Sequence, residues 1–133
     1  MKVIKSLDVF ENKLMKMFLN GEGNVFSRLK KQYMVINVIS REHSDAGFFT
    51  NFSLPENSED LRLDNKSFHI GDIDGSVNGI AGAVGFVLYI KHGAIALLEG
   101  YTNALNKWPK SNNEITLEYD SPNKRNIDLI IRA

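Results

Sequence analysis

The residues best suited to chemistry lie where an apolar run ends, in Glu99-Gly100-Tyr101, and a little later in Trp108-Pro109. A glutamate that closes an apolar strand must reach the rim of the sheet or find a partner, because a buried lone carboxylate is costly. The chain has one tryptophan, and in a loop it either covers the core or is exposed to a ligand. Two interpretations stay open: Trp108 caps the open end of the core, or it helps to line an aromatic pocket with Glu99 at its rim.

The histidines and the absence of cysteine limit the kinds of catalytic site that the sequence can form. His43, His69 and His92 lie in or beside different turns, and acidic residues are near each in the sequence. A histidine paired with a carboxylate can act as a general base, but the sequence brings no two of these groups together. The chain has no cysteine, which excludes a thiol nucleophile, a disulfide and a thiolate zinc site. We therefore assign no catalytic residue.

Two further motifs resemble ligand loops only in part. Asp72-Ile73-Asp74-Gly75 has alternate carboxylates before a glycine, but a calcium loop needs another ligand before that glycine and a later bidentate glutamate. The glycines from Gly75 to Gly85 lack the Gly-Lys-Ser/Thr ending of a phosphate-binding loop and precede a strand rather than a helix. We predict no metal site and no cofactor.

The charge balance constrains the partners. Sixteen basic and sixteen acidic residues give a net charge of zero, so no long-range field attracts nucleic acid or an anionic membrane. The basic edge Arg28, Lys30 and Lys31 is typical of a solvated helix face. The apolar stretch Val77–Ile90 contains several glycines and is too short to span a membrane. We expect no nucleic acid and no membrane among the partners, and easier self-association because self-repulsion is weak.

The N-terminal part predicts two helices that must support these groups. Apolar residues recur at spacings of three and four over residues 6–20, with Ser6 as a candidate N-cap. A second, shorter helix starts near Asn24 and places Phe26, Leu29 and Tyr33 on one face. The two helices form a hairpin across Gly21-Glu22-Gly23. Lys13 and Lys16, like the other charged residues of these segments, are expected on the outer surface.

From residue 34 the period changes to that of strands. In Phe48–Leu54 the even-numbered residues share one face and Phe49 points to the other. A turn at Gly71–Gly75 is expected after a short strand at residues 68–70. The hairpin 84–98, turning at His92-Gly93, is apolar almost throughout, which predicts a central position with both faces covered. Strands are further expected at 34–39 and 115–119, an irregular connection at 55–66, and a strand or a short helix at Ile127–Ile131.

These elements predict an α+β domain in which an N-terminal helical hairpin packs on one mainly antiparallel sheet of about six strands. At 133 residues, one hydrophobic core is affordable and two are not, so residues 1–133 should form a single domain. Charged residues interrupt the N-terminal region where a secretion signal needs an apolar run. Together with the lack of cysteine, this favours a cytoplasmic protein.

Seven short motifs follow one another along the chain: Ser40-Arg41-Glu42, Gly47 to Phe52, Gly71-Asp72-Ile73, Gly85 to Ile90, His92-Gly93, Leu98 to Tyr101 and Trp108-Pro109. Taken in this order, they resemble a family of small uncharacterised bacterial proteins. The resemblance covers residues 10–119, and it implies a compact bacterial cytoplasmic domain without an established activity, catalytic set or cofactor. The loop 104–107 lacks the acidic residues expected from the family, which weighs against a carboxylate site there.

Two functional hypotheses follow. The first is a non-catalytic protein-binding module, for example an immunity-like protein that neutralises a toxin, or a self-associating domain such as a homodimer. Its contact surface would use Phe49 and the rim around Glu99, Tyr101 and Trp108. The second is a small-ligand binder or hydrolase-type enzyme with a pocket near Glu99, Tyr101 and Trp108, in which Glu99 and a histidine would be the acid-base groups.

Overall fold

Two helices begin the fold in the computed structural model, which describes residues 8–120, 125 and 130–132. They are α1 (Val9–Phe18) and α2 (Asn24–Tyr33). The Asp8 carboxylate accepts a hydrogen bond from the Glu11 amide (2.7 Å), and the Glu11 carboxylate accepts one from the Asp8 amide (3.1 Å). This reciprocal cap needs an acidic or amide side chain three residues after the cap residue. Asp8 meets that condition and Ser6 does not, so the start expected at Ser6, itself outside the described residues, is wrong.

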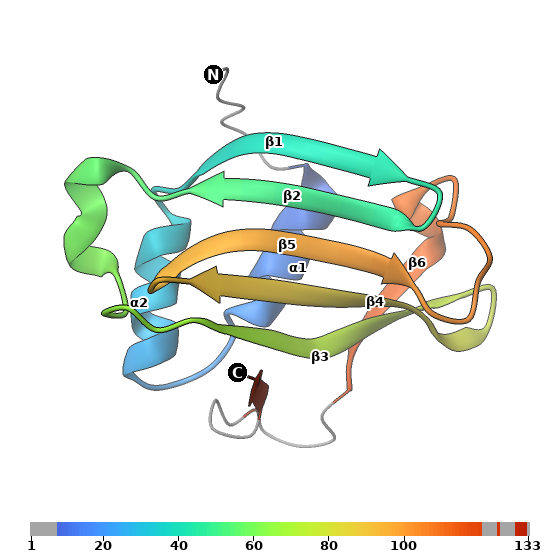
Figure 1. Ribbon diagram of the computed structural model, residues 1–133. Coiled ribbons are helices and arrows are strands. Elements are labelled where there is room, and N and C mark those ends of the chain that lie inside the picture. The colour runs from blue at the N-terminus through green and yellow to red at the C-terminus, as the bar shows by residue number, and fades with distance from the viewer. Residues whose placement is uncertain (1–7, 121–124, 126–129, 133) are drawn as a thin grey trace.

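All strand pairs are antiparallel, and the strands form one sheet in the order β1-β2-β5-β4-β3-β6, with the short β7 also pairing with β3 (Figure 1). Both helices lie behind the sheet in Figure 1, on the same face. The expected α+β class and the helical hairpin on an antiparallel sheet are therefore confirmed. The strands are β1 (Asn37–Ser44), β2 (Gly47–Ser53), β3 (Phe68–Val77), β4 (Ile80–Lys91), β5 (Ala94–Thr102), β6 (Ile115–Tyr119) and β7 (Ile131–Arg132).

The hydrophobic core lies between the helices and one face of the sheet. Alternation along β4 places Phe86 and Leu88 in this core together with Leu98 of β5, and all three are fully buried. The helices contribute Leu14, Phe18, Phe26 and Leu29, which are also fully buried. The face of the sheet in contact with the helices is called the inner face below, and the opposite face the outer face. The inner face is mainly apolar, as the sequence periodicity requires, and the buried polar residues Glu11, Gln32, Thr50 and Asp72 are exceptions.

Two expected boundaries are wrong for local reasons. The first strand starts at Asn37 instead of residue 34, because the amides of Val35 and Ile36 still bond to the Gln32 carbonyl at the end of α2. The turn expected at Gly71–Gly75 is instead a bulge within β3, where the pairing with β4 shifts between Ile70 and Ile73. The chain reverses later, at Asn78-Gly79, with positive φ at both residues. An Asn-Gly pair is typical of a two-residue hairpin turn, because both residues tolerate positive φ.

The hairpin β4–β5 is central in the sheet, as its apolar sequence predicts. The prediction that both of its faces are covered holds only for the inner face, since neither α1 nor α2 lies on the outer one. On the outer face Val87, Tyr89 and Leu97 are half-buried, and register places Tyr89 directly opposite Leu97. Large side chains on neighbouring strands thus shield one another on an open sheet face.

Two of the connections between strands contain short 3-10 helices. The segment expected to be irregular between residues 55 and 66 contains a short 3-10 helix, η1 (Glu56–Leu61). A second 3-10 turn, η2 (Asn112–Glu114), precedes β6. At the C-terminal end, Ile131 pairs with Ile70 of β3 as a strand residue, while residues 127–129 of the expected final element lie outside the described residues.

Candidate functional site

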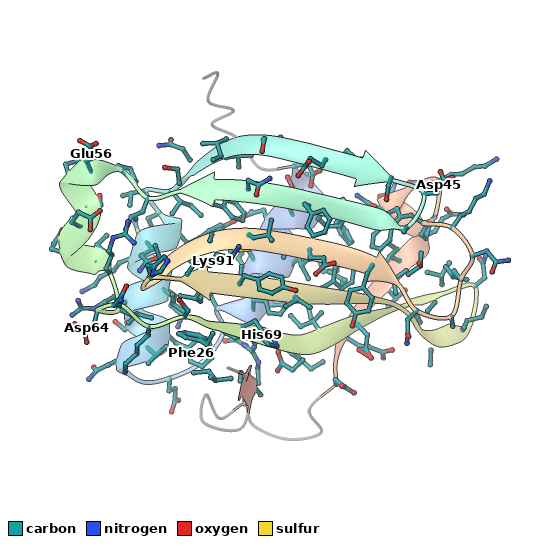
Figure 2. The ribbon with its side chains drawn as sticks, viewed as in Figure 1. Phe26, Asp45, Glu56, Asp64, His69 and Lys91 are labelled. Carbon is teal, nitrogen blue, oxygen red and sulfur yellow. The ribbon has the colours of Figure 1, made fainter. Side chains whose placement is uncertain are left out.

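Three of the four predicted site residues lie together on the outer face. Phe49 of β2 is directly opposite Glu99 of β5, and Tyr101 lies two residues further along β5. Phe49 and Tyr101 are each 39% exposed, which is high for aromatic side chains in a sheet. Figure 2 views the molecule from this side, with His69 and Lys91 labelled. The sheet register therefore assembles an aromatic surface around a carboxylate.

Trp108 lies on the other side of the sheet. Its ring packs edge-on against Phe48 (5.4 Å between centroids) and Phe86 (5.8 Å), both inner-face residues. Its backbone amide donates to the Asp45 carbonyl (2.6 Å) and its Nε1 donates to Asn112 Oδ1 (3.2 Å). Trp108 thus covers the end of the core, in agreement with the first of the two interpretations. It does not share a pocket with Glu99 and Tyr101, because it contacts Gly100 of β5 from the opposite face.

Tyr101 has a glycine opposite it on each of the two neighbouring strands. Its neighbours across the two adjacent strands are Gly47 on β2 and Gly85 on β4. A Cβ atom at Gly85 would collide with the Tyr101 ring, so the ring occupies the space that a side chain at Gly85 would fill. Burial, followed by the nearby negative charges of Asp74, Glu99 and Asp120, raises the pKa of the Tyr101 hydroxyl. The hydroxyl is consequently neutral at physiological pH and can donate a hydrogen bond.

Glu99 is bound within the same face. Its Oε1 accepts a hydrogen bond from the Tyr89 hydroxyl at 2.9 Å. Burial, then this hydrogen bond and the Glu99 charge, raises the pKa of Tyr89. Tyr89 also contacts the His69 ring, with 5.7 Å between the ring centroids. Glu99 is therefore held in place by Tyr89, between two strands that carry aromatic residues.

An acidic row extends this surface toward β6. Asp74 of β3 is directly opposite Glu118 of β6, although like charges in this position are unfavourable. Burial, then the charges of Asp120, Glu118 and Asp72, raises the pKa of Asp74. Among the described residues, Asp74 Oδ1 is a buried oxygen without a hydrogen-bond partner. The outer face thus combines exposed aromatic rings with carboxylates whose charge is poorly compensated, a composition suited to cationic side chains.

A second polar site lies beside Trp108. It is a cleft of about 310 Å³ lined by residues that include Glu11, Arg41 and His43. The Glu11 carboxylate accepts hydrogen bonds from Arg41 (2.7 Å to Nη2) and from the Thr50 hydroxyl (2.5 Å). Burial alone would raise the pKa of Glu11, but the bonds from Arg41, Thr50 and the Asp8 backbone outweigh it and lower the pKa. A carboxylate held ionised in this way anchors Arg41 and is a poor proton donor or acceptor.

The importance of Glu11 is missed by the sequence prediction, which places it among the solvated residues of an amphipathic helix. A signal was present in Thr50, which alternation places on the buried face of β2. A buried hydroxyl requires a polar partner, and the charged residue of α1 closest to the helix start is Glu11. The identity of that partner depends on how α1 crosses the sheet, which the sequence does not fix.

The histidines are far from a shared catalytic arrangement. His43 lines the cleft beside Trp108, whereas His69 lies on the outer face next to Tyr89. His92 occupies the β4–β5 turn with φ of 51°, and its Nδ1 is 3.0 Å from Asn65 Oδ1. Among residues 8–120, 125 and 130–132, no group of three His, Asp or Glu side chains is arranged to hold a metal ion.

Asp72 and Asp74 do not converge on one ligand position. The bulge in β3 turns Asp72 toward the helices, where it forms a bidentate ion pair with Arg125 (2.9 Å for both contacts). Asp74 lies on the outer face instead. Their alternate spacing therefore reflects two separate electrostatic roles.

Comparison with family models, with curated proteins and with solved structures gave no match. The resemblance to small bacterial proteins consequently stays a prediction. In the described part of the chain, no helix is both long and apolar enough to cross a membrane.

Proposed function

We propose that this chain is a non-catalytic protein-binding module that contacts a basic protein partner through its outer sheet face. The observation that carries this proposal is the exposure of Phe49 and Tyr101 around Glu99 on a face without a helix. A few residues near the centre of a protein interface supply most of its binding free energy, and tyrosine is enriched among them. The carboxylates of Glu42, Asp74 and Glu118 surround them and favour a partner rich in Lys and Arg.

Charge favours a different protein over a second copy as the partner. In a symmetric dimer formed through the outer face, the same surface occurs on both subunits. Asp74, Glu99 and Glu118 of one copy would then approach the same carboxylates of the other, which costs binding free energy. Self-association, including a homodimer, is for this reason an outcome of the experiment below and not its expectation.

The alternative function, a small-ligand binder or hydrolase-type enzyme, receives less support. It requires Glu99, Tyr101 and Trp108 around one cavity, yet Trp108 packs on Phe86 of the inner face. It also requires a histidine near Glu99, whose carboxylate is bonded to the Tyr89 hydroxyl instead. A binding role for the outer face needs neither condition.

An immunity-like protein in the bacterial cytoplasm is the concrete form of this proposal. Immunity proteins act by covering a toxin, so a small, non-catalytic domain with one complementary face is sufficient. Many toxins that act on nucleic acids have basic active-site surfaces, since their substrates carry phosphate charges. An acidic face with aromatic anchors would suit such a surface. The small size of the domain and the negative charge of its outer face support this form of the proposal.

The test is affinity capture from a lysate of the source organism with surface variants. Tyr101→Ala and Glu118→Lys change the outer face. The controls Met34→Ala and Glu56→Lys also remove a large exposed side chain and reverse a charge, but at exposed positions outside that face. We expect one basic protein to be recovered with the wild type and both controls. With the purified partner, each outer-face variant should raise the dissociation constant about tenfold or more.

Three results would contradict the proposal. The outer-face variants could bind the partner as tightly as the controls, which would place the interface elsewhere. The wild-type protein could capture no partner reproducibly and stay monomeric. Alternatively, it could form a dimer that Tyr101→Ala disrupts, in which case the outer face binds a second copy of the chain.

A further inference from the structure

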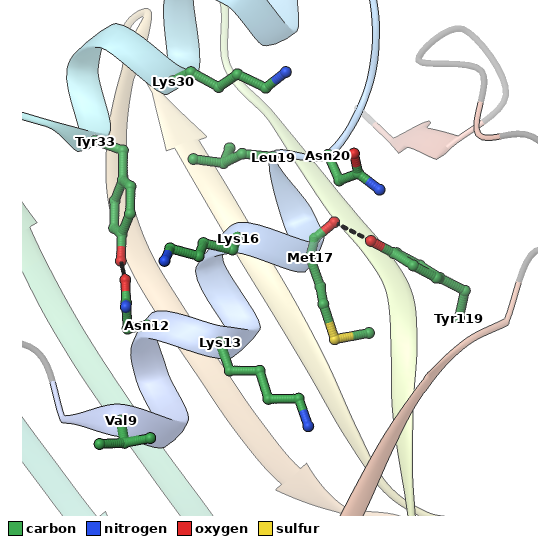
Figure 3. Close-up of a pocket in the computed structure, with 10 residues that line it drawn as sticks. All are labelled: Val9, Asn12, Lys13, Lys16, Met17, Leu19, Asn20, Lys30, Tyr33 and Tyr119. Atoms are coloured by element: carbon green, nitrogen blue, oxygen red, sulfur yellow. Dashed lines mark hydrogen bonds between the residues drawn. The ribbon is translucent and has the colours of Figure 1, made fainter.

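A second surface, unrelated to the outer sheet face, is a groove on the helical side of the molecule. It has a volume of about 610 Å³ and runs along α1, with α2 and β6 forming its other walls. Val9, Met17 and Leu19 of the α1 segment supply apolar lining, and Tyr33 and Tyr119 supply aromatic rings. Figure 3 shows these side chains around the open space between the two helices and β6. The volume lies within the range typical of small-molecule sites, about 300–1,000 Å³.

The charged residues of this groove are all basic. Lys13, Lys16 and Lys30 line it, and none of its lining residues is acidic. Figure 3 shows Lys16 extending from α1 toward the side of Tyr33, while Lys30 extends from α2. The Lys30 ammonium donates to the Gly21 carbonyl at 3.0 Å, which holds it at the edge of the groove. Three ammonium groups without a carboxylate produce a local positive potential on a chain that is neutral as a whole.

The two tyrosine hydroxyls of the walls are already bonded. The Tyr33 hydroxyl bonds to Asn12 Oδ1, and the Tyr119 hydroxyl donates to the Met17 carbonyl at 2.7 Å. Burial and the Glu11 charge raise the pKa of Tyr33 to about 12, so this ring adds no negative charge. Val9, at one end, is 88% exposed to solvent. A ligand therefore meets apolar surface in the groove and free cationic charge at its rim.

We propose that this groove binds a single-chain amphipathic anion, that is, a hydrocarbon chain with one carboxylate or similar anionic head group. The hydrocarbon would lie against Val9 and Met17, next to the buried Leu19, and would remove the exposed apolar surface of Val9 and Met17 from water. The head group would lie between the lysine ammonium groups at the rim. A purely hydrophilic anion would leave the apolar lining exposed, and a cationic or neutral amphiphile would leave the three lysines uncompensated.

The first experiment is a titration of the full chain with sodium decanoate below its critical micelle concentration. Binding is followed by calorimetry and by the methyl NMR signal of Met17, which reports on the groove. Octanoate and dodecanoate test the role of the hydrocarbon: each added methylene that enters the groove should tighten binding roughly fourfold. Decyltrimethylammonium, which has the same chain and the opposite charge, should bind at least tenfold more weakly than decanoate.

The second experiment tests the lysines with a charge-matched control. In Lys13→Gln/Lys16→Gln the groove loses two positive charges, whereas Lys31→Gln/Lys107→Gln loses two from exposed positions outside it. Each exposed ammonium should contribute about two- to fivefold to decanoate affinity. The groove variant is therefore expected to bind about tenfold more weakly, and the control variant to bind like the wild type.

Several results would overturn this proposal. Decanoate could leave the Met17 signal unchanged, bind with no dependence on chain length, or bind equally well to the groove variant. An acidic amphipathic peptide that shifts the Met17 signal where decanoate does not would show that the groove accepts protein segments. A Met17 signal that depends on protein concentration alone would indicate that a second copy of the chain occupies the groove.

Discussion

Single residues at the junction of helix and sheet determine how the two layers meet, and Glu11 is the strongest example. It is a buried acid, yet it is satisfied by Arg41, by Thr50 and by the cap of its own helix. One side chain thus fixes the start of α1 and its contact with both β1 and β2. Removing one partner of such a pair is costly because the other charge stays partly buried.

Glu11→Gln should lower the free energy of unfolding by about 2–3 kcal/mol at pH 7. The value is below the full range for buried pairs because the Arg41 side chain is 22% exposed and solvent screens its charge. Urea denaturation followed by circular dichroism measures this change. Glu56→Gln, on an exposed turn of η1, is the control and should stay within about 0.5 kcal/mol of the wild type. An equal loss in both variants would contradict the role of Glu11.

The same carboxylate should make stability depend on pH. The folded state lowers the pKa of Glu11 below its ordinary value of 4.5. Its stabilisation is therefore fully present above pH 4.5 and is lost as the pH falls through the folded-state pKa. Denaturation midpoints measured from pH 6 down to pH 3 should fall more steeply for the wild type than for Glu11→Gln. Parallel curves would show that other acids account for the acid sensitivity.

At the scale of elements, two hairpin turns offer a matched comparison. Asn78-Gly79 joins β3 to β4 and His92-Gly93 joins β4 to β5, and both glycines have a φ of 80°. A Cβ at Gly79 would meet nothing within 4 Å, whereas one at Gly93 would collide with the Asp64 carbonyl oxygen. The two turns therefore separate the backbone cost of a non-glycine residue from the cost of steric overlap.

Gly79→Ala should destabilise the protein by about 1 kcal/mol, the typical cost of a left-handed conformation for alanine. Gly93→Ala should cost at least about 3 kcal/mol, because the segment at Asp64 must also move. That movement would disturb the Gly93 carbonyl, which accepts from Gln32 Nε2 at 2.8 Å. Thermal unfolding of the two variants gives the comparison, and equal losses would refute the steric argument.

The periodicity of the sequence predicts where most helices and strands lie, but it does not predict which residues from other elements they contact. The alternation of Phe48 and Phe49 correctly assigns one to the core and one to the outer face, because a strand fixes orientation residue by residue. The turn in β3 is misplaced because a bulge and a turn both use glycine and aspartate, and only pairing with β4 distinguishes them. Trp108 follows β5 by several loop residues, so its face depends on how that loop folds back. For this reason the pocket hypothesis based on the sequence placed Trp108 beside Tyr101, although the two residues lie on opposite faces of the sheet.

For the whole molecule, zero net charge conceals an uneven distribution. Carboxylates of β3, β5 and β6 gather on the outer face, including Asp74, Glu99 and Glu118. Lysines line the groove on the helical side. The two surfaces lie on opposite sides of the core and are suited to ligands of opposite charge. Higher salt should weaken both proposed interactions, since exposed charges are screened.

Arg125 connects the layers that carry these two surfaces. Its guanidinium forms the bidentate pair with Asp72 on β3 and donates to the carbonyls of Met17, Phe18 and Asn20 at the end of α1. It also lies 4.9 Å from the centroid of the Tyr119 ring on β6. One cation therefore compensates a buried carboxylate and the negative end of a helix dipole.

Arg125→Met should lower the free energy of unfolding by about 3–5 kcal/mol, because Asp72 loses its ion pair and the α1 carbonyls lose their donor. Arg125→Lys keeps the charge but cannot provide the same forked contacts, so it should recover only part of the loss. Adding Asp72→Asn to Arg125→Met should cost less than the two single changes summed, since the two residues interact directly. Chemical denaturation of these four variants measures the coupling. Strict additivity would mean that Arg125 and Asp72 stabilise the fold independently, against the geometry of their contact.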